Sequence, residues 1–207
     1  MKKMLVVLLV ALVAVFSVNA IGPEFGIKAG LTMGNIVYGD DNAPQDFDTD
    51  MFRAGLTGGI MMEMPMGPLS LGAELLYTQK GEKFDTFANN YLAAVPVSVT
   101  AKLDYIEVPV MAKLSLLPLV KFYGGVSFGF LVSAEMVSEI NDTEVASADM
   151  KDFMNSTEMG AIFGAQVKIS KLVFDARYNM GLTDIMKDNE GDAVKLSTLY
   201  ATVGFMF

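Results

Sequence analysis

Eight segments of this chain alternate apolar residues with small or polar ones at a period of two, the pattern of a β-strand with one apolar face. In the last of them, one face carries Leu199, Ala201, Val203, Phe205 and Phe207, and the other carries Thr198, Tyr200, Thr202 and Gly204. The remaining segments cover about residues 24–37, 52–64, 69–78, 105–114, 121–133, 159–169 and 172–182. The pattern therefore predicts an all-β fold.

The connections between these segments are alternately short and long. The short ones are residues 65–68, 117–119 and 170–171, and the long ones are about 40–50, 81–99, 136–156 and 184–195. Outer-membrane barrels have an even number of strands, short periplasmic turns and long outer loops, and closure leaves no free edge. The sequence therefore predicts an eight-stranded antiparallel up-and-down transmembrane β-barrel. Both ends of the barrel domain are expected on the short-turn side.

Alternation alone does not decide which face points outward, because a soluble eight-stranded barrel has its apolar face inside. In this chain the polar face is mostly Gly, Ser and Thr with isolated charges, which suits a narrow polar lumen better than a solvated surface. Aromatic residues also gather near the strand ends, where interfacial girdles would lie. They are Phe25, Phe122, Phe174 and Phe207 at one end and Tyr38, Phe52, Tyr77 and Tyr178 at the other.

Pro109 lies inside the fourth segment, where a fully paired strand should not tolerate it. Proline has no N–H group to donate to a neighbouring strand. We therefore expect a bulge or a missing ladder hydrogen bond at this position.

The N-terminus has the features of an export signal. Lys2 and Lys3 precede an apolar run over residues 4–16, and small residues end the segment at Ala20. This predicts a signal peptide over residues 1–20, cleaved after Ala20, and a barrel domain over residues 21–207. The full chain already has a net charge of −9, and cleavage would remove two lysines, so nucleic acid is not expected as a partner. The absence of cysteine excludes a disulfide scaffold.

Five stretches resemble the PorT-like outer-membrane β-barrel family. They are FGIKAGL at 25–31, LLYTQKG at 75–81, YIEVP at 105–109, GGVSFG at 124–129 and DARYNMGL at 175–182. The resemblance implies a small eight-stranded barrel of the outer membrane, similar to OmpA- and OmpX-type barrels, and makes Pro109 a family feature. PorT itself belongs to a protein-secretion and gliding system. The resemblance does not imply one activity.

Enzymatic chemistry has few candidates in this sequence. Without histidine or cysteine, the chain lacks Ser-His and Cys-His nucleophile pairs and the usual zinc ligands. We expect no enzyme activity, no cofactor and no dedicated metal site. The acidic segment 188–192 lacks the spacing and closing Glu of a calcium loop, so a solvated loop is expected. Whether the acidic loops bridge to lipopolysaccharide through divalent ions stays open.

Charged residues on the polar face are expected to meet inside the barrel. Counting from the turns places Lys28 and Arg177 at a similar height to Glu74 and Glu107, with Asp175 nearby. Unpaired buried charges are costly, so these five residues are predicted to form one ion-pair network in which Arg177 and Glu107 are coupled.

The expected role is that of a barrel with a side-chain-filled interior and a structural or surface-interaction function through four outer loops. A component of a PorT-type secretion or gliding system and a soluble periplasmic ligand-binding barrel are the alternatives. Expected partners are outer-membrane lipid and lipopolysaccharide, envelope or secretion proteins, and the barrel-insertion machinery. As the outer-membrane resemblance implies, that machinery would read Phe207 as part of its C-terminal signal.

Overall fold

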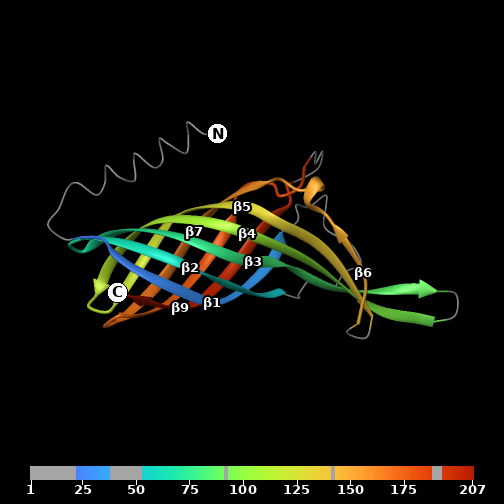
Figure 1. The fold of residues 1–207 in the computed structure, drawn as a ribbon, viewed down its shortest axis with the longest axis horizontal. Helices are drawn as coiled ribbons and strands as arrows, with labels where there is room; N and C mark the ends of the chain where they lie inside the picture. The colour runs from blue at the N-terminus through green and yellow to red at the C-terminus, as the bar shows by residue number, and fades with distance from the viewer. Residues whose placement is uncertain (1–21, 38–52, 91–92, 141–142, 188–192) are drawn as a thin grey trace.

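The computed structural model describes residues 22–37, 53–90, 93–140, 143–187 and 193–207 (Figure 1). The predicted signal peptide and the first predicted loop, residues 40–50, lie outside the described residues. Among the described residues no helix is long and apolar enough to span a membrane.

The described chain consists almost entirely of antiparallel strands. They are β1 (Glu24–Val37), β2 (Arg53–Met66), β3 (Leu69–Asn90), β4 (Ala93–Leu117), β5 (Val120–Ile140), β6 (Thr143–Asp149), β7 (Thr157–Ile169), β8 (Leu172–Gly181) and β9 (Lys195–Met206). A single 3-10 turn, η1 (Lys151–Phe153), follows β6 within these described ranges.

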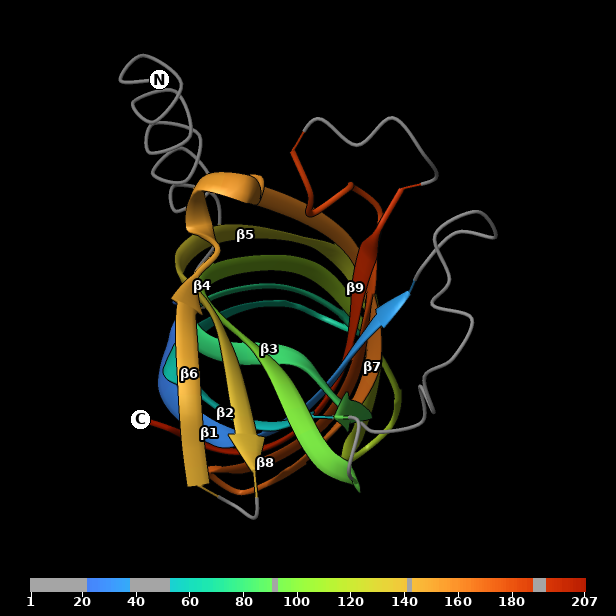
Figure 2. The ribbon, with the colours of Figure 1, turned by 90° about the vertical axis from the view of Figure 1, so that its right-hand side faces the viewer.

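Eight of the strands close into a ring. The strand order is β4-β3-β2-β1-β9-β8-β7-β5, and an additional pairing of β4 with β5 completes the circle. The seam between the first and last strands runs from Gly26 opposite Met206 to Val37 opposite Lys195. Figure 2 shows the curved strands around the lumen. The predicted eight-stranded antiparallel barrel is confirmed.

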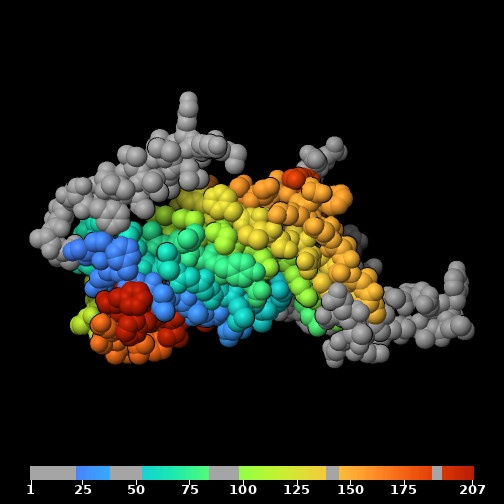
Figure 3. Space-filling model, viewed as in Figure 1, coloured from blue at the N-terminus to red at the C-terminus, as the bar shows by residue number. Residues whose placement is uncertain are grey.

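The apolar face of each barrel strand points outward. Ile27, Leu31 and Leu56 are 51%, 53% and 60% exposed, whereas Thr32 and Glu107 are almost completely buried. Figure 3 shows the outer wall as a continuous surface from β1 through β5. Such a distribution is inverted relative to a soluble barrel and matches a lipid-facing wall around a polar lumen. Tyr38 and Phe52, two of the predicted girdle residues, lie outside the described residues.

The second and third long connections differ from the expected loops. β3 continues to Asn90 and β4 begins at Ala93, so residues 81–99 are mostly paired strand. β5 likewise continues to Ile140. The extra strand β6 pairs with the outer part of β5. The sequence interpretation ended these strands where apolar alternation weakened. Beyond the membrane both faces of a strand can meet water, so backbone pairing continues without a strict apolar pattern.

β5 therefore has two partners on the same side. Its first half pairs with β7, from Val120 opposite Val167 to Phe130 opposite Thr157. Its outer part, Glu135 to Ile140, pairs with β6 instead. Together β3, β4, β5 and β6 extend beyond the ring at the end opposite the short turns and the C-terminus (Figure 1). We call these outer parts the strand platform.

Pro109 interrupts one side of its strand. It pairs with Ser127 of β5, but the described register between β3 and β4 includes no partner for Pro109 or for Val108. The register is the same on both sides of this gap, from Ala73 opposite Val110 to Leu76 opposite Glu107. As expected, the pairing of Pro109 with β3 is missing. The register shifts between β4 and β5 lie at other positions, Asp104/Tyr105 and Ser115/Leu117.

The two ends of the barrel should differ in their accessibility from outside the cell. Because the chain has no cysteine, single-cysteine variants report one position each. Ser147→Cys on exposed β6 should react with a 5-kDa maleimide polymer on intact cells. Lys171→Cys, in the short turn after β7, should react only after the outer membrane is permeabilised. Labelling of the Lys171→Cys variant on intact cells would contradict the predicted orientation, in which the short turns face the periplasm.

Candidate functional site

A cluster of four charged side chains crosses the middle of the lumen. The Lys28 ammonium on β1 lies 3.1 Å from Glu74 on β3 and 3.2 Å from Asp175 on β8. The Arg177 guanidinium lies 2.7 Å from Glu74 and 3.8 Å from Asp175. All four side chains are 2% exposed. Two positive and two negative groups thus compensate one another away from water, as buried charges require.

Tyr123 of β5 adds hydrogen bonds to this middle cluster. Its hydroxyl donates to the Asp175 carboxylate at 2.7 Å and accepts from Nε of Arg177 at 3.1 Å. The guanidinium of Arg177 also lies over the Tyr123 ring, 5.5 Å from its centre. The Tyr123 hydroxyl thus satisfies hydrogen-bonding groups of Asp175 and Arg177 that are not used in the ion pairs. This reduces the cost of burying the charges.

A second, upper cluster lies farther from the short turns. Lys80 of β3 contacts two carboxylates, Glu107 of β4 at 2.5 Å and Glu158 of β7. The Tyr200 hydroxyl donates to Glu107 at 2.8 Å, and the Lys80 ammonium lies over the Tyr105 ring. The Lys80 side chain is fully buried. With two carboxylates around one ammonium, this cluster relies on Lys80 for both of its ion pairs.

The predicted single network is therefore divided. Lys28, Glu74, Asp175 and Arg177 meet, but Glu107 pairs with Lys80 rather than with Arg177. The ring of Tyr200 stands between them, since Arg177 lies over its face and Glu107 accepts its hydroxyl. The prediction that Arg177 and Glu107 meet directly is wrong. Because β3 continues beyond residue 78, Lys80 reaches the lumen at the height of Glu107.

A third, lower cluster lies near the short turns. Glu63 of β2 is 3.0 Å from the Lys113 ammonium and also contacts Lys121. Ser70 donates to Glu63 at 2.9 Å, and Lys113 donates to Gln166 at 2.7 Å. Sequence reasoning did not single out this cluster. Its signal was nevertheless present, because each of these residues is a polar position on the inner face of an alternating strand.

Apolar side chains fill the lumen between the charged clusters. Met61, Val173 and Met206 pack together, as do Met111, Tyr123 and Ile162. Above the upper cluster, a larger group closes the outer end: Leu103, Tyr105, Leu131, Ala134, Met154, Ile185, Val194 and Leu196. We call this group the apolar cap. Charged clusters and packed apolar side chains thus follow one another along the described lumen.

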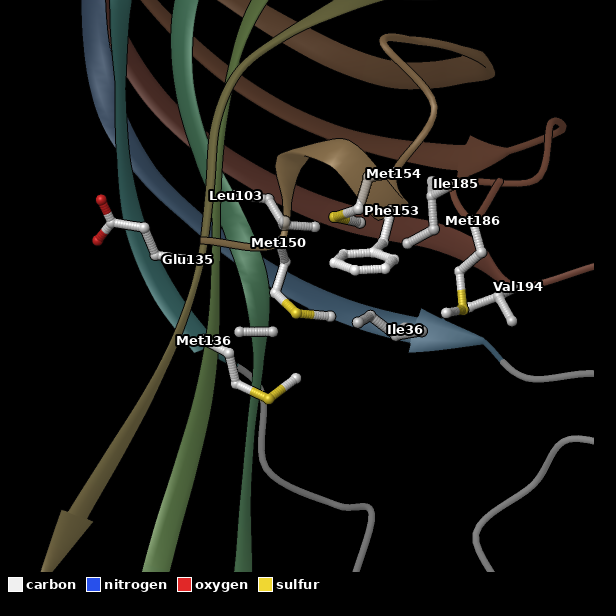
Figure 4. Close-up of a pocket in the computed structure, with 11 residues that line it drawn as sticks. Ile36, Leu103, Glu135, Met136, Met150, Phe153, Met154, Ile185, Met186 and Val194 are labelled. Carbon is white, nitrogen blue, oxygen red and sulfur yellow. The ribbon is translucent and has the colours of Figure 1, made fainter. Parts of the chain in front are cut away.

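A pocket opens above the apolar cap at the outer mouth. It has a volume of about 190 Å³, and its lining residues are Ile36, Ala101, Leu103, Glu135, Met136, Met150, Phe153, Met154, Ile185, Met186 and Val194. Figure 4 shows these side chains coming from β1, β4 and β5, from η1 and its neighbours, and from the segment between β8 and β9. No sequence argument pointed to it, because most of its walls come from segments interpreted as loops or lying between predicted strands.

Metal-binding geometry does not occur in the described part of the chain: it contains no group of three or more acidic side chains arranged to hold a metal ion. Most of the acidic residues that raised the question, including those of segments 40–50 and 188–192, lie outside the described residues.

Phe207 lies at the seam. Its backbone N–H donates to the Phe25 carbonyl oxygen at 2.8 Å, and its ring, 69% exposed, meets Phe205 edge-on at 6.0 Å between ring centres. The terminal aromatic ring thus faces outward beside the first strand. The exposed ring is available for contact with another protein.

Deletion of Phe207 is expected to lower the fraction of inserted barrel several-fold. Its loss removes one hydrogen bond and an exposed ring, so the stability of already folded barrel should change by about 1 kcal/mol or less. The inserted fraction is measured in cells by heat-modifiable gel mobility, and stability is measured by refolding the purified chain. Phe205→Leu, which keeps the terminal residue, is the control. A normal inserted fraction without Phe207 would contradict the predicted signal role.

The closed ring, outward apolar wall and polar, filled lumen define an outer-membrane β-barrel. Residues 19–187 match the family model described as outer membrane protein beta-barrel domain. The chain belongs to this family, which places it among proteins of the outer membrane. Among curated proteins, none matches this chain.

Two solved structures are similar to this chain over most of its length. Neisserial surface protein A (NspA) has a TM-score of 0.50 and 14% identity, covering 90% of this chain and 99% of that one. Ail, the attachment invasion locus protein of Yersinia pestis, has a TM-score of 0.49 and 16% identity, covering 89% and 98%. The likeness to NspA supports the fold alone.

Proposed function

We propose that this barrel acts at the cell exterior as a surface-interaction protein. The strand platform carries the proposal. β3, β4 and β5 have 22, 25 and 21 residues, whereas β8 and β9 have 10 and 12. A bilayer crossing needs about 9–11 residues of a tilted strand. The extra length therefore projects from the membrane on one side of the ring.

The filled lumen favours a surface role over transport. Three charge clusters and the apolar cap occupy the described interior, so ions would have to displace buried ion pairs to pass. Purified barrel in a planar bilayer should therefore conduct no ions above background. Stable single-channel currents would contradict a closed lumen.

Shortening the platform tests the surface role directly. One variant replaces residues 84–99 with Asn-Gly, joining the paired positions Lys83 and Thr100, and a control replaces only residues 89–94. Both should keep the heat-modifiable mobility of a folded barrel, because the ring strands remain. We expect cell attachment to surfaces or neighbouring cells to fall several-fold in the first variant and to change less in the control.

The PorT-type alternative makes a different prediction. A secretion or gliding component would act with envelope partner proteins, so deleting the whole chain would change the set of secreted proteins. A census of culture supernatants from deletion and parent strains separates the two roles. Reduced secretion with unchanged attachment would support the secretion role and overturn the surface proposal. Contacts with lipopolysaccharide and the insertion machinery are proposed under either role.

A further inference from the structure

The mouth pocket has the size of a small-molecule site. Its volume is about 190 Å³. An apolar cavity of about 150 Å³ in another protein binds benzene, so this pocket has room for a six-membered ring with one or two further carbon atoms. Larger molecules would have to displace its walls.

The pocket wall selects for an uncharged molecule. Of its lining residues, Glu135 carries the only charged side chain, and in Figure 4 its carboxylate points away from the methionines. Leu103, Met154, Ile185 and Val194 form the floor and belong to the buried apolar cap. A charged group placed on this floor would lose its hydration without gaining a partner.

Methionine gives the wall an affinity for aromatic rings. Met136, Met150, Met154 and Met186 all line the pocket, and Figure 4 shows their side chains around it. The thioether is flexible and polarizable, and sulfur contacts with aromatic rings are favourable. Flexible methionines also adapt to ligands of slightly different shape.

The rim leaves apolar surface exposed at the outer end of the barrel. Phe153 is 64% exposed and Met186 is 40% exposed. A ligand seated between them would remove part of this surface from water, which favours binding. Phe153 is the last residue of η1 and lines the pocket, so its ring can contact an occupant.

We propose that the mouth pocket binds small uncharged monocyclic aromatic molecules. Toluene is the neutral probe, and benzoate, of similar size but anionic, is its charged counterpart. The inference does not depend on the surface-interaction role, because the pocket and the strand platform are tested by different variants.

The test uses the full barrel in lipid nanodiscs, since detergent could itself enter an apolar pocket. With methionine ε-methyl groups labelled with ¹³C, toluene should cause saturable shifts at Met136, Met150, Met154 and Met186. Benzoate should bind at least tenfold more weakly. Met61 and Met206, deep in the lumen, should not shift with the same saturation curve.

Filling the pocket should abolish the effect. Ala101→Phe places a ring in the pocket, and Ala146→Phe makes the same change on exposed β6, outside it. Toluene affinity should fall at least tenfold in the first variant and stay within twofold in the second. Met150→Gln, a polar replacement of similar length, should weaken binding several-fold and serves if Ala101→Phe does not fold. Linear, unsaturable shifts, or saturable shifts that pocket-filling leaves unchanged, would overturn the proposal.

Discussion

Exchanging Lys80 for methionine is expected to destabilise the folded barrel by about 3–5 kcal/mol, the usual cost of leaving a buried charge without its partner. Methionine keeps most of the length and apolar stem of lysine, so packing changes little. In the native barrel, both Glu107 and Glu158 contact the Lys80 ammonium. In the variant, the two side chains would face each other without this cation. This effect should exceed that at any singly paired lysine of the lumen.

Removing one of the two carboxylates should recover part of that loss. The double variant Lys80→Met with Glu158→Gln leaves one charged carboxylate, hydrogen-bonded to Tyr200, and should be more stable than the single variant. The measurement is guanidinium unfolding of the barrel in vesicles, followed by gel mobility. Lys168→Met is the control, because its pairing with Glu24 is partly exposed and should contribute less than about 1 kcal/mol. Equal losses at Lys80 and Lys168 would rule out a compensating role for Lys80.

Arg177→Met is expected to cost a comparable 3–5 kcal/mol. The change removes the ion pair with Glu74 at 2.7 Å and a donor to the Tyr123 hydroxyl. Lys28 would then face both Glu74 and Asp175 alone, leaving the middle cluster with an excess negative charge.

A double-mutant comparison separates the two clusters. Glu74→Gln with Arg177→Met should cost clearly less than the sum of the single changes, because each single change strands a partner. Glu107→Gln with Arg177→Met should be closer to additive, since these side chains meet only through Tyr200. Both cycles use the same unfolding assay. Stronger coupling for the Glu107 pair would contradict the division into middle and upper clusters.

The wall of the barrel could be predicted from the sequence because its pattern is local. Alternation at a period of two reports which side chains share a face, and connection length reports the end at which each turn lies. The inward positions of Lys28, Glu74 and Arg177 follow from that pattern. Their partners do not, because contacts across a lumen depend on strand tilt and on the relative heights of strands far apart in the sequence.

Strand length caused the main errors. Lys80 lies just beyond the segment predicted to end at residue 78, and Glu158 lies just before the segment predicted to begin at 159. Both continue the inward alternation of β3 and β7, so extending the period by one or two residues would have included them. The mouth pocket had no such signal, since its walls come from several separate segments.

The middle cluster has a consequence for how the ring shuts. Lys28 belongs to β1, while Asp175 and Arg177 belong to β8, beyond the seam partner β9. Lys28 can therefore reach Asp175 only once the first and last strands have met. We infer that this ion pair forms late and stabilises the closed barrel after assembly. Contacts formed late in folding mainly slow unfolding. Lys28→Met should therefore speed unfolding of the barrel and leave the rate of insertion nearly unchanged. Slower insertion with a normal unfolding rate would contradict this inference.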